Sequence, residues 1–310
     1  MGAIFIIMMA GVVYYIGSQV NTQVPVSFRI SKETAPSNVV FEYSLKDIPA
    51  KSIAQIDFKD HFSRDDRENL KVLERTQTKI THTYLVSGVY HPVVLVNNKP
   101  IDTLTVCIYS NDWEFILAKY LSDSKEFFPV SNTSISTQNG ILTIPAKEIH
   151  HYIQDTVSDF WIKYRYLKNF DIKPSQLAFE VKARSINQFK NRCNELDFWI
   201  IGKKNNLVFK IFDPGCGGEF SKVQLGNRLV DGNYNDLSAF GHSLQNWRTI
   251  GLSTKNSRAY ITIDGKEIYQ DQIEGDLGEL CGFVLHSKGG AEFDYVHLNA
   301  DGKELVKEEF

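Results

Sequence analysis

The chain has 310 residues, of which 43% are hydrophobic, 12% aromatic and 23% charged, and its formal net charge is −3. This length and apolar content allow two domains with cores of their own and exclude a largely disordered chain. The slight negative charge leaves no basic surface for a phosphate backbone, so we expect no nucleic-acid partner. Four cysteines are too few for a disulfide-stapled scaffold.

Residues 1–23 are predicted to be a membrane anchor or signal segment. Residues 2–16 are apolar throughout, and the first charged residue of the chain is Arg29. As a helix, such a run reaches about 22 Å, which is less than the roughly 30 Å hydrocarbon core of a bilayer. The basic start and small-residue cleavage site of a signal peptide are missing. We favour an uncleaved anchor, with a signal-peptide core or a buried helix as alternatives, and place the remaining chain outside the cytoplasm, in a bacterial periplasm or at a cell surface.

Residues 24–110 are predicted to form an immunoglobulin-like sandwich. Short runs rich in Val, Ile, Thr, Tyr and Phe are separated here by Gly, Pro, Asn and Asp, the pattern of strands and turns. The expected strands cover residues 38–44, 53–58, 80–84, 89–97 and 101–109. Several short strands at this spacing in about 85 residues are typical of that fold.

Part of this region resembles the PKD (polycystic-kidney-disease) domain family. The matching residues are THTY at 81–84, SGVY at 87–90 and VVLVN at 93–97. The family's Trp-x-Phe-Gly-Asp-Gly motif is matched only by IDFKD at 56–60, which lacks the tryptophan and the glycines. The resemblance implies a spacer or contact module outside the membrane, without catalysis. It also implies that His82, Tyr84 and Tyr90 have structural roles.

Residues 111–137 are expected to be a connector, because Pro129 and the polar run at 131–134 mark an exposed loop. Residues 113–121 form an amphipathic stretch with helical periodicity inside it. Residues 64–75 are the other stretch of this kind, and their mixed charges suggest a solvated connection.

Residues 138–310 are predicted to form a larger two-sheet jelly roll, because about ten alternating runs occur in about 170 residues. The expected strands cover residues 140–145, 160–166, 177–184, 196–201, 207–212, 247–252, 258–263, 266–269, 281–286 and 291–298. Asp264-Gly265 suits a two-residue hairpin turn.

This region resembles the concanavalin A-like lectin/glucanase superfold, including its laminin-G-like and 3-keto-disaccharide-hydrolase-like branches. The resemblance is carried by residues 247–252, 259–269, 282–285 and 293–298. It implies a jelly roll that binds a carbohydrate or, in the glucanase members, cleaves one.

Hydrolysis would need two carboxylates about 5–5.5 Å apart for retention or about 6.5–9.5 Å apart for inversion. Laminarinase-type members place their carboxylates on one strand as Glu-x-Asp-x-Glu. Here Glu195 and Asp197 occupy the first two positions, and Trp199 replaces the third carboxylate. The resemblance therefore does not carry that activity over. Glu180, Glu195 and Asp197 are kept as ligand-binding candidates that we expect to lie near one another across strands. Trp161, Trp199 and Trp247 are interpreted as core residues.

A calcium loop is suggested by Asp231, Asn233 and Asn235, whose spacing supplies oxygen ligands. The rest of that loop fails, because Asp236 and His242 stand where glycine and a bidentate glutamate are needed, so an ordinary polar loop is favoured. We expect no cofactor, with calcium as the alternative.

The cysteines suggest a bridge in an oxidising compartment. Cys193 and Cys216 flank a turn-rich interval and are the favoured disulfide, with two buried free thiols as the alternative. The other pair would be Cys107 with Cys281, which are far apart in sequence and expected in different domains.

The function that these features favour is non-catalytic recognition of a carbohydrate or an envelope protein by the jelly roll, with the first domain as a spacer. An envelope glycoside-processing hydrolase is the first alternative, and a structural subunit of a surface assembly is the second.

Overall fold

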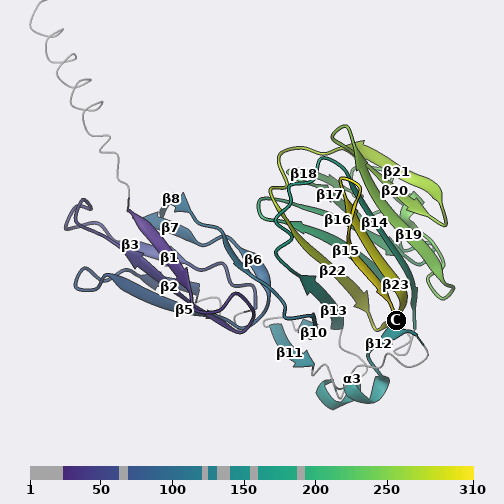
Figure 1. The fold of residues 1–310 in the computed structure, drawn as a ribbon, viewed down its shortest axis with the longest axis horizontal. Helices are drawn as coiled ribbons and strands as arrows, with labels where there is room; N and C mark the ends of the chain where they lie inside the picture. Colours follow the sequence, from purple (N-terminus) through teal and green to yellow (C-terminus); the bar gives the residue numbers. More distant parts are fainter. Residues whose placement is uncertain (1–23, 63–68, 121–124, 131–139, 154–159, 187–192) are drawn as a thin grey trace, which may run out of the picture. The chain divides into compact units, whose positions relative to one another are not determined.

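The computed structural model describes residues 24–62, 69–120, 125–130, 140–153, 160–186 and 193–310 (Figure 1). The expected anchor at 1–23 lies outside them. Within the described residues, no helix has the length and apolarity needed to cross a membrane. The chain folds into two compact units. Within the described part, the first comprises 24–32, 37–84 and 90–106, and the second comprises 33–36, 85–89 and 107–310.

The first unit is a β-sandwich. Its described strands form a three-stranded sheet in the order β1-β2-β5 and a four-stranded sheet in the order β4-β3-β7-β8. The strands are β1 (Val26–Ile30), β2 (Ser37–Tyr43), β3 (Ala54–Asp57), β4 (Leu70–Val72), β5 (Lys79–Tyr84), β7 (Val93–Val96) and β8 (Lys99–Thr103). A separate pair is formed by β6 (Gly88–Tyr90) and β9 (Val106–Ile108), most of whose residues belong to the second unit. Phe41 of β2 and Phe58 after β3 join the two sheets, with ring centroids 5.3 Å apart. Tyr84 is fully buried and donates a hydrogen bond to the Phe58 carbonyl at 3.0 Å, so its role is structural, as the sequence predicts.

The second unit is a larger sandwich. Its described strands form an eight-stranded sheet, β11-β10-β13-β22-β15-β16-β17-β18, and a seven-stranded sheet, β12-β23-β14-β19-β20-β21 with β24 beside β23 (Figure 1). The first sheet contains β10 (Trp113–Tyr120), β11 (Lys125–Val130), β13 (Phe160–Leu167), β15 (Glu195–Gly202), β16 (Asn206–Phe212), β17 (Lys222–Leu225), β18 (Arg228–Asp231) and β22 (Leu280–Lys288). The second contains β12 (Leu142–Thr143), β14 (Leu177–Ser185), β19 (Arg248–Lys255), β20 (Arg258–Ile263), β21 (Lys266–Gln272), β23 (Ala291–Ala300) and β24 (Lys303–Glu309).

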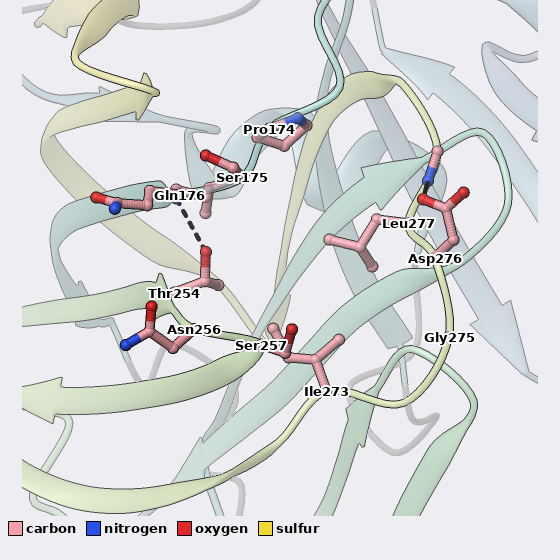
Figure 2. Close-up of a pocket in the computed structure, with 12 residues that line it drawn as sticks. Pro174, Ser175, Gln176, Thr254, Asn256, Ser257, Ile273, Gly275, Asp276 and Leu277 are labelled. Carbon is pink, nitrogen blue, oxygen red and sulfur yellow. Dashed lines mark hydrogen bonds between the residues drawn. The ribbon is translucent and has the colours of Figure 1, made fainter.

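The described part of the second unit also contains two short helices, α3 (Ala146–Tyr152) and the 3-10 helix η2 (Ser238–Phe240). At one end of the unit, β14 begins beside the end of β19. There the Leu177 N–H donates to Thr254 Oγ1 at 2.9 Å (Figure 2).

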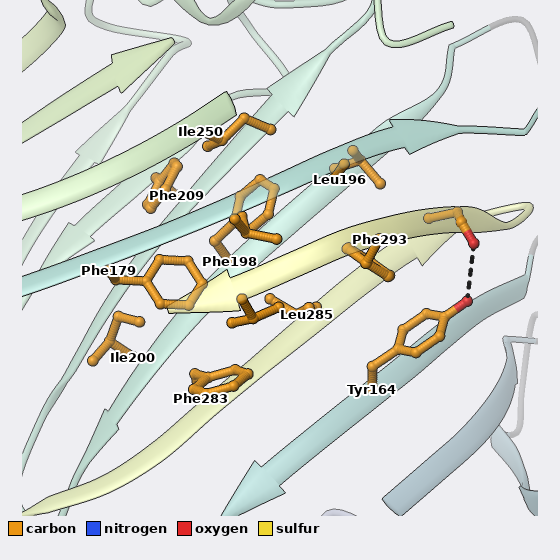
Figure 3. Packing of buried hydrophobic residues seen from close by; sticks show 14 of the residues in the cluster. Tyr164, Phe179, Leu196, Phe198, Ile200, Phe209, Ile250, Phe283, Leu285 and Phe293 are labelled. Carbon is orange, nitrogen blue, oxygen red and sulfur yellow. Dashed lines mark hydrogen bonds between the residues drawn. The ribbon is translucent and has the colours of Figure 1, made fainter. Parts of the chain in front are cut away.

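The core of the second unit lies between its two sheets and is rich in phenylalanine (Figure 3). Phe179 of β14 meets Phe283 of β22 at 5.4 Å between ring centroids, and Phe198 stacks on Phe209 at 5.1 Å. The strict alternation of buried and less buried residues in β14 is what a strand with one face on a core requires. Each fully buried side chain of this size contributes roughly 1.5–3 kcal/mol of transfer free energy.

The predicted connector at 111–137 is different in the structure, because β10 and β11 of the eight-stranded sheet fall inside it. Phe115 and Leu117 of β10 point into the core, while the residues that follow them, Ile116 and Ala118, are also fully buried. A strand covered on both faces loses the apolar–polar alternation that identifies strands. The helical periodicity predicted for residues 113–121 is therefore wrong. Segments 33–36, 85–89 and 107–110, within the predicted first domain, also belong to the second unit.

Candidate functional site

A row of ionisable side chains crosses four neighbouring strands of the eight-stranded sheet. Lys163 of β13 is registered with His286 of β22, His286 with Asp197 of β15, and Asp197 with Lys210 of β16. The residues before each of these and after three of them, such as Ile162 and Phe198, belong to the core, and Ser287 after His286 is fully buried. Because side chains alternate along a strand, the row lies on the face of this sheet that points away from the core, which we term the outer face.

The row and two tryptophans line a cavity of about 310 Å³ on the outer face. Its lining consists of Trp161, Lys163, Asp197, Trp199, Lys210 and His286. The rings of Trp199 and His286 lie 5.0 Å apart, and the Lys288 ammonium lies 5.4 Å from the centroid of the Trp161 ring. The cavity therefore combines aromatic surface with charged and polar groups, as small-ligand sites do.

Lys210 joins the two carboxylates that follow the Glu-x-Asp spacing. Its ammonium nitrogen lies 2.5 Å from Glu195 Oε1 and 3.2 Å from Asp197 Oδ2. Burial lowers the pKa of Lys210, but the negative charges of Asp197 and Glu195 outweigh it and raise that pKa above its ordinary value. The site thus holds a fixed positive charge between its acidic groups.

Glu195 is the carboxyl that titrates near neutral pH. Burial is the main reason that the pKa of Glu195 rises to about 7, and the charge of Asp197 and a hydrogen bond with it add to the effect. Lys210 opposes this rise without cancelling it. A carboxyl in this range can hold or release a proton at physiological pH.

His286 is neutral in the folded chain. Burial lowers its pKa well below 6.5, and the positive charges of Lys163, Arg165 and Lys210 lower it further. Its Nδ1 lies 3.7 Å from Asp197 Oδ2, which is longer than a hydrogen bond. His286 therefore supplies an uncharged ring beside Trp199 and no second cation.

Two polar atoms at the cavity are buried without a hydrogen-bond partner in the described part of the chain, Asp197 Oδ1 and Trp199 Nε1. Asp197 as a whole is 3% exposed. Leaving such a group unpaired costs about 1–3 kcal/mol, and more for a charged one. One atom is an acceptor and the other a donor, and both belong to residues that line the cavity.

The disulfide lies at the start of the strand that carries the two carboxylates. Cys193 is bonded to Cys216 with Cα atoms 5.8 Å apart. Next to it, Asn194 Nδ2 donates to Asp213 Oδ2 at 2.6 Å. The bridge ties the beginning of β15 to the turn after β16, which holds Glu195 close to Lys210.

The structure separates Glu180 from the other two candidates. Glu180 lies on β14 of the seven-stranded sheet and accepts a hydrogen bond from the Tyr295 hydroxyl at 2.9 Å. Its neighbours Phe179 and Val181 point into the core, so Glu180 faces away from it on the opposite side of the sandwich. The expectation that it lies near Glu195 and Asp197 is wrong.

The suggested calcium residues form a loop that is closed by its own hydrogen bonds. Asp231 Oδ1 accepts from the backbone N–H and the side-chain amide of Asn233 at 2.9 and 2.8 Å, and Asp231 Oδ2 lies 3.1 Å from the Lys222 ammonium. Asn235 donates to the Asp231 carbonyl at 2.9 Å. Within the ranges that the structure describes, no group of three or more His, Cys, Asp or Glu residues is placed to hold a metal ion.

The prediction that Trp161, Trp199 and Trp247 are core residues is wrong. Trp161 and Trp199 are half-buried and line the cavity on the outer face, and Trp247 is half-buried under the Arg184 guanidinium at 4.7 Å. Trp113 is instead the tryptophan of the core. The period-two spacing of Trp161, Lys163 and Arg165 was the available signal, because it puts all three on the face opposite Ile162.

A second cavity, of about 400 Å³, lies at the end of the sandwich among residues 174–177, 254–257 and 273–278 (Figure 2). Its one carboxylate within the described lining, that of Asp276, accepts from the Gly278 N–H at 2.9 Å and pairs with Lys204 and Lys173 at 2.9 and 3.0 Å. These contacts, the N–H of Gly278 first, lower the pKa of Asp276. This cavity is larger, but its acidic group is fully engaged, so the outer-face cavity is the better candidate.

No protein-family model matches the chain, and no curated protein matches it. Among solved structures, an alginate lyase from Corynebacterium sp. is similar at 8% identity over 61% of this chain and 93% of that one, with a TM-score of 0.33. The β-glucanase of Bacillus licheniformis matches at 11% identity over 59% and 90%, with a TM-score of 0.31. The Emp47p carbohydrate recognition domain matches at 13% over 61% and 89%, with a TM-score of 0.39. Likenesses this slight carry no argument on function.

Proposed function

We propose that the outer face of the eight-stranded sheet binds a carbohydrate without cleaving it, with the ligand seated against Trp161, Trp199 and Asp197. The observation that carries this proposal is the pair of unpartnered polar atoms at the cavity, Asp197 Oδ1 and Trp199 Nε1. Sugars present hydroxyl groups that donate and accept at once, together with apolar ring faces that pack on aromatic side chains. A ligand of this chemistry satisfies both atoms.

The arrangement of the carboxylates supports binding over hydrolysis. Glu195 and Asp197 both contact the Lys210 ammonium, at 2.5 and 3.2 Å, so this cation lies between their carboxylates. A glycosidase instead keeps its two carboxyl groups about 5 Å or more apart, so that a glycosidic bond fits between them. The third position of the acidic pattern is Trp199, which cannot transfer a proton in such a reaction.

The rest of the proposal concerns architecture and location. The second unit is a concanavalin-like jelly roll, the first is a PKD-like spacer, and residues 1–23 tether the chain to a membrane with both units outside the cytoplasm. The two packed sheets of each unit support the first part. The Cys193–Cys216 disulfide supports an oxidising compartment, such as the bacterial periplasm or the cell surface.

A glycan array probed with the whole chain tests binding. We expect retained glycans with the unchanged chain and at least about a tenfold weaker affinity for Trp199→Ala and Asp197→Ala, because each variant removes a hydrogen bond worth about 1.5 kcal/mol or more. Trp247→Ala is the matched control, since Trp247 is also half-buried but lies just before β19 of the other sheet. An array without any retained glycan, or an equal loss for Trp247→Ala, would refute this site.

A hydrolase is the second candidate, because a pKa of about 7 suits Glu195 to donate a proton. The test is release of reducing ends from the glycans that the array retains. We expect none. Release that disappears in Glu195→Gln would replace the binding proposal with a catalytic one.

A further inference from the structure

Cys107 and Cys281 meet in the second unit, although the sequence places them far apart and suggests different domains. Cys281 of β22 is buried, and Cys107 of β9 is partly exposed. Both pack with Leu167, Ile201 and Val284 in a small apolar cluster on the outer face. Cys281 Sγ donates to the Glu279 carbonyl at 3.7 Å, and Cys107 packs against the same cluster. This cluster is separate from the Cys193–Cys216 bridge, which lies beyond the other end of β15.

Backbone hydrogen bonds hold the two cysteines in place. The Ser110 N–H donates to the Leu167 carbonyl at 2.9 Å, and the Lys168 N–H donates to the Cys281 carbonyl at 3.0 Å. The segment after Cys107 therefore follows the end of β13, and β13 in turn lies beside Cys281. Because both cysteines lie in one small cluster and their strands are held by these hydrogen bonds, we expect a bond between them to close without a large movement.

We propose that Cys107 and Cys281 are an oxidisable pair, in which Cys107 reacts first with an external disulfide and Cys281 then closes an intramolecular disulfide. In the first step, the Cys107 thiolate attacks one sulfur of a small disulfide such as oxidised glutathione, and one glutathione thiolate leaves. In the second, the Cys281 thiolate attacks Cys107 Sγ and releases the other glutathione. The two cysteines lose two protons and two electrons, and the electrons reduce the external disulfide.

The surroundings of the pair favour this order. Only Cys107 has exposed surface that a reagent can reach. The hydrogen bond from Cys281 lowers the pKa of Cys107, burial opposes this, and the charge of Lys203 lowers it further. The same hydrogen bond and burial raise the pKa of Cys281. Lys203 is itself paired with Glu279, two residues before Cys281. An accessible thiolate with a protonated, buried partner is the arrangement of an attacking and a resolving thiol.

The test uses the whole chain, first reduced mildly and then treated with oxidised glutathione under native conditions. We expect peptide mapping by mass spectrometry to find a peptide pair that joins Cys107 to Cys281. We expect Cys281→Ser to keep a stable glutathione adduct on Cys107, and Cys107→Ser to form its adduct on Cys281 more than about tenfold more slowly. The Cys193→Ser/Cys216→Ser double variant is the control, and the 107–281 link should still form in it.

Four results would overturn the proposal. Both cysteines could stay free in the unchanged chain at glutathione concentrations that oxidise an exposed thiol. The linked peptides could join either residue to Cys193, Cys216 or a second chain. The two single variants could form adducts at equal rates, which would remove the order of attack. The double variant could lose the 107–281 link, which would make that link a product of disulfide exchange. The mapping on the unchanged chain does not depend on whether any variant folds.

Discussion

Replacing Glu195 with glutamine should remove a pH dependence from the stability of the second unit. Glu195 is a largely buried carboxyl that shares the Lys210 ammonium with Asp197, and burial raises its pKa from an ordinary 4.5 to about 7. Between these two values the folded chain keeps the proton that the unfolded chain has released. The unfolded state then binds fewer protons, so the free energy of unfolding falls as the pH rises. A glutamine has the same shape and does not titrate.

The size of the effect follows from the shift. Each pKa unit corresponds to about 1.36 kcal/mol, so a rise from 4.5 to about 7 amounts to about 3 kcal/mol in all, of which about 2.5 kcal/mol falls between pH 5 and pH 8. His286 acts in the opposite direction, because its lowered pKa makes stability rise with pH up to about 6.5. His286 is present in both proteins, so its contribution cancels when the two pH profiles are subtracted.

The measurement is urea unfolding at pH 5 and pH 8, followed by tryptophan fluorescence. The four tryptophans, Trp113, Trp161, Trp199 and Trp247, belong to the second unit, so the signal reports that unit and not the first. We expect the unchanged chain to lose about 2.5 kcal/mol more than Glu195→Gln between the two pH values. Glu267→Gln is the matched control, because Glu267 is exposed on β21 of the other sheet.

Two results would refute this reasoning. If Glu195→Gln keeps the full loss between pH 5 and pH 8, the titrating group lies elsewhere and Glu195 is not held in a desolvated site. If Glu267→Gln removes the loss as well, the pH dependence comes from overall charge and not from burial.

Three further changes test the scaffold. Replacing Cys193 and Cys216 with alanine should lower the free energy of unfolding by about 3.5 kcal/mol, from the entropy of a loop with a sequence separation of 23, and an unchanged urea midpoint would contradict this. Phe198→Ala, in the fully buried core, should cost about 3–5 kcal/mol in the same assay, and a cost below about 1 kcal/mol would mean that the site collapses freely. Tyr84→Phe should cost the first unit about 1–3 kcal/mol, because the Phe58 carbonyl loses its donor, and hydrogen exchange over residues 37–84 should accelerate while the second unit stays unchanged.

Much of the strand pattern could be predicted from the sequence, because one face of each strand meets a core. β14 is an example, where residues alternate in burial from Leu177 to Ser185. β10 could not be recognised in this way, since Ile116 and Ala118 are as buried as Phe115 and Leu117. Periodicity reports the difference between two faces, and a strand covered on both faces shows none.

The candidate site could be predicted only where its residues share a strand. Glu195 and Asp197 are two positions apart, so the sequence puts them on one face. Lys210 and His286 join them through the pairing of β15 with β16 and β22, and nothing local in the sequence encodes the pairing with β22. The expectation that Glu180 lies near Glu195 and Asp197 is wrong for the same reason. The sheet to which a strand belongs is decided by long-range packing, which the local sequence does not show.

Asp197 carries a free-energy penalty of burial that the stability of the fold does not require. A buried carboxylate has to be paired, and a hydrophobic residue of similar volume would often serve stability as well or better. Lys210 engages only one oxygen of Asp197, and the other is buried with no partner in the described part of the chain. A ligand that donates a hydroxyl to this oxygen removes an existing penalty, so its free energy of binding gains more than an exposed acceptor would provide. On the proposed function, this gain is the physical reason for a carboxylate at position 197.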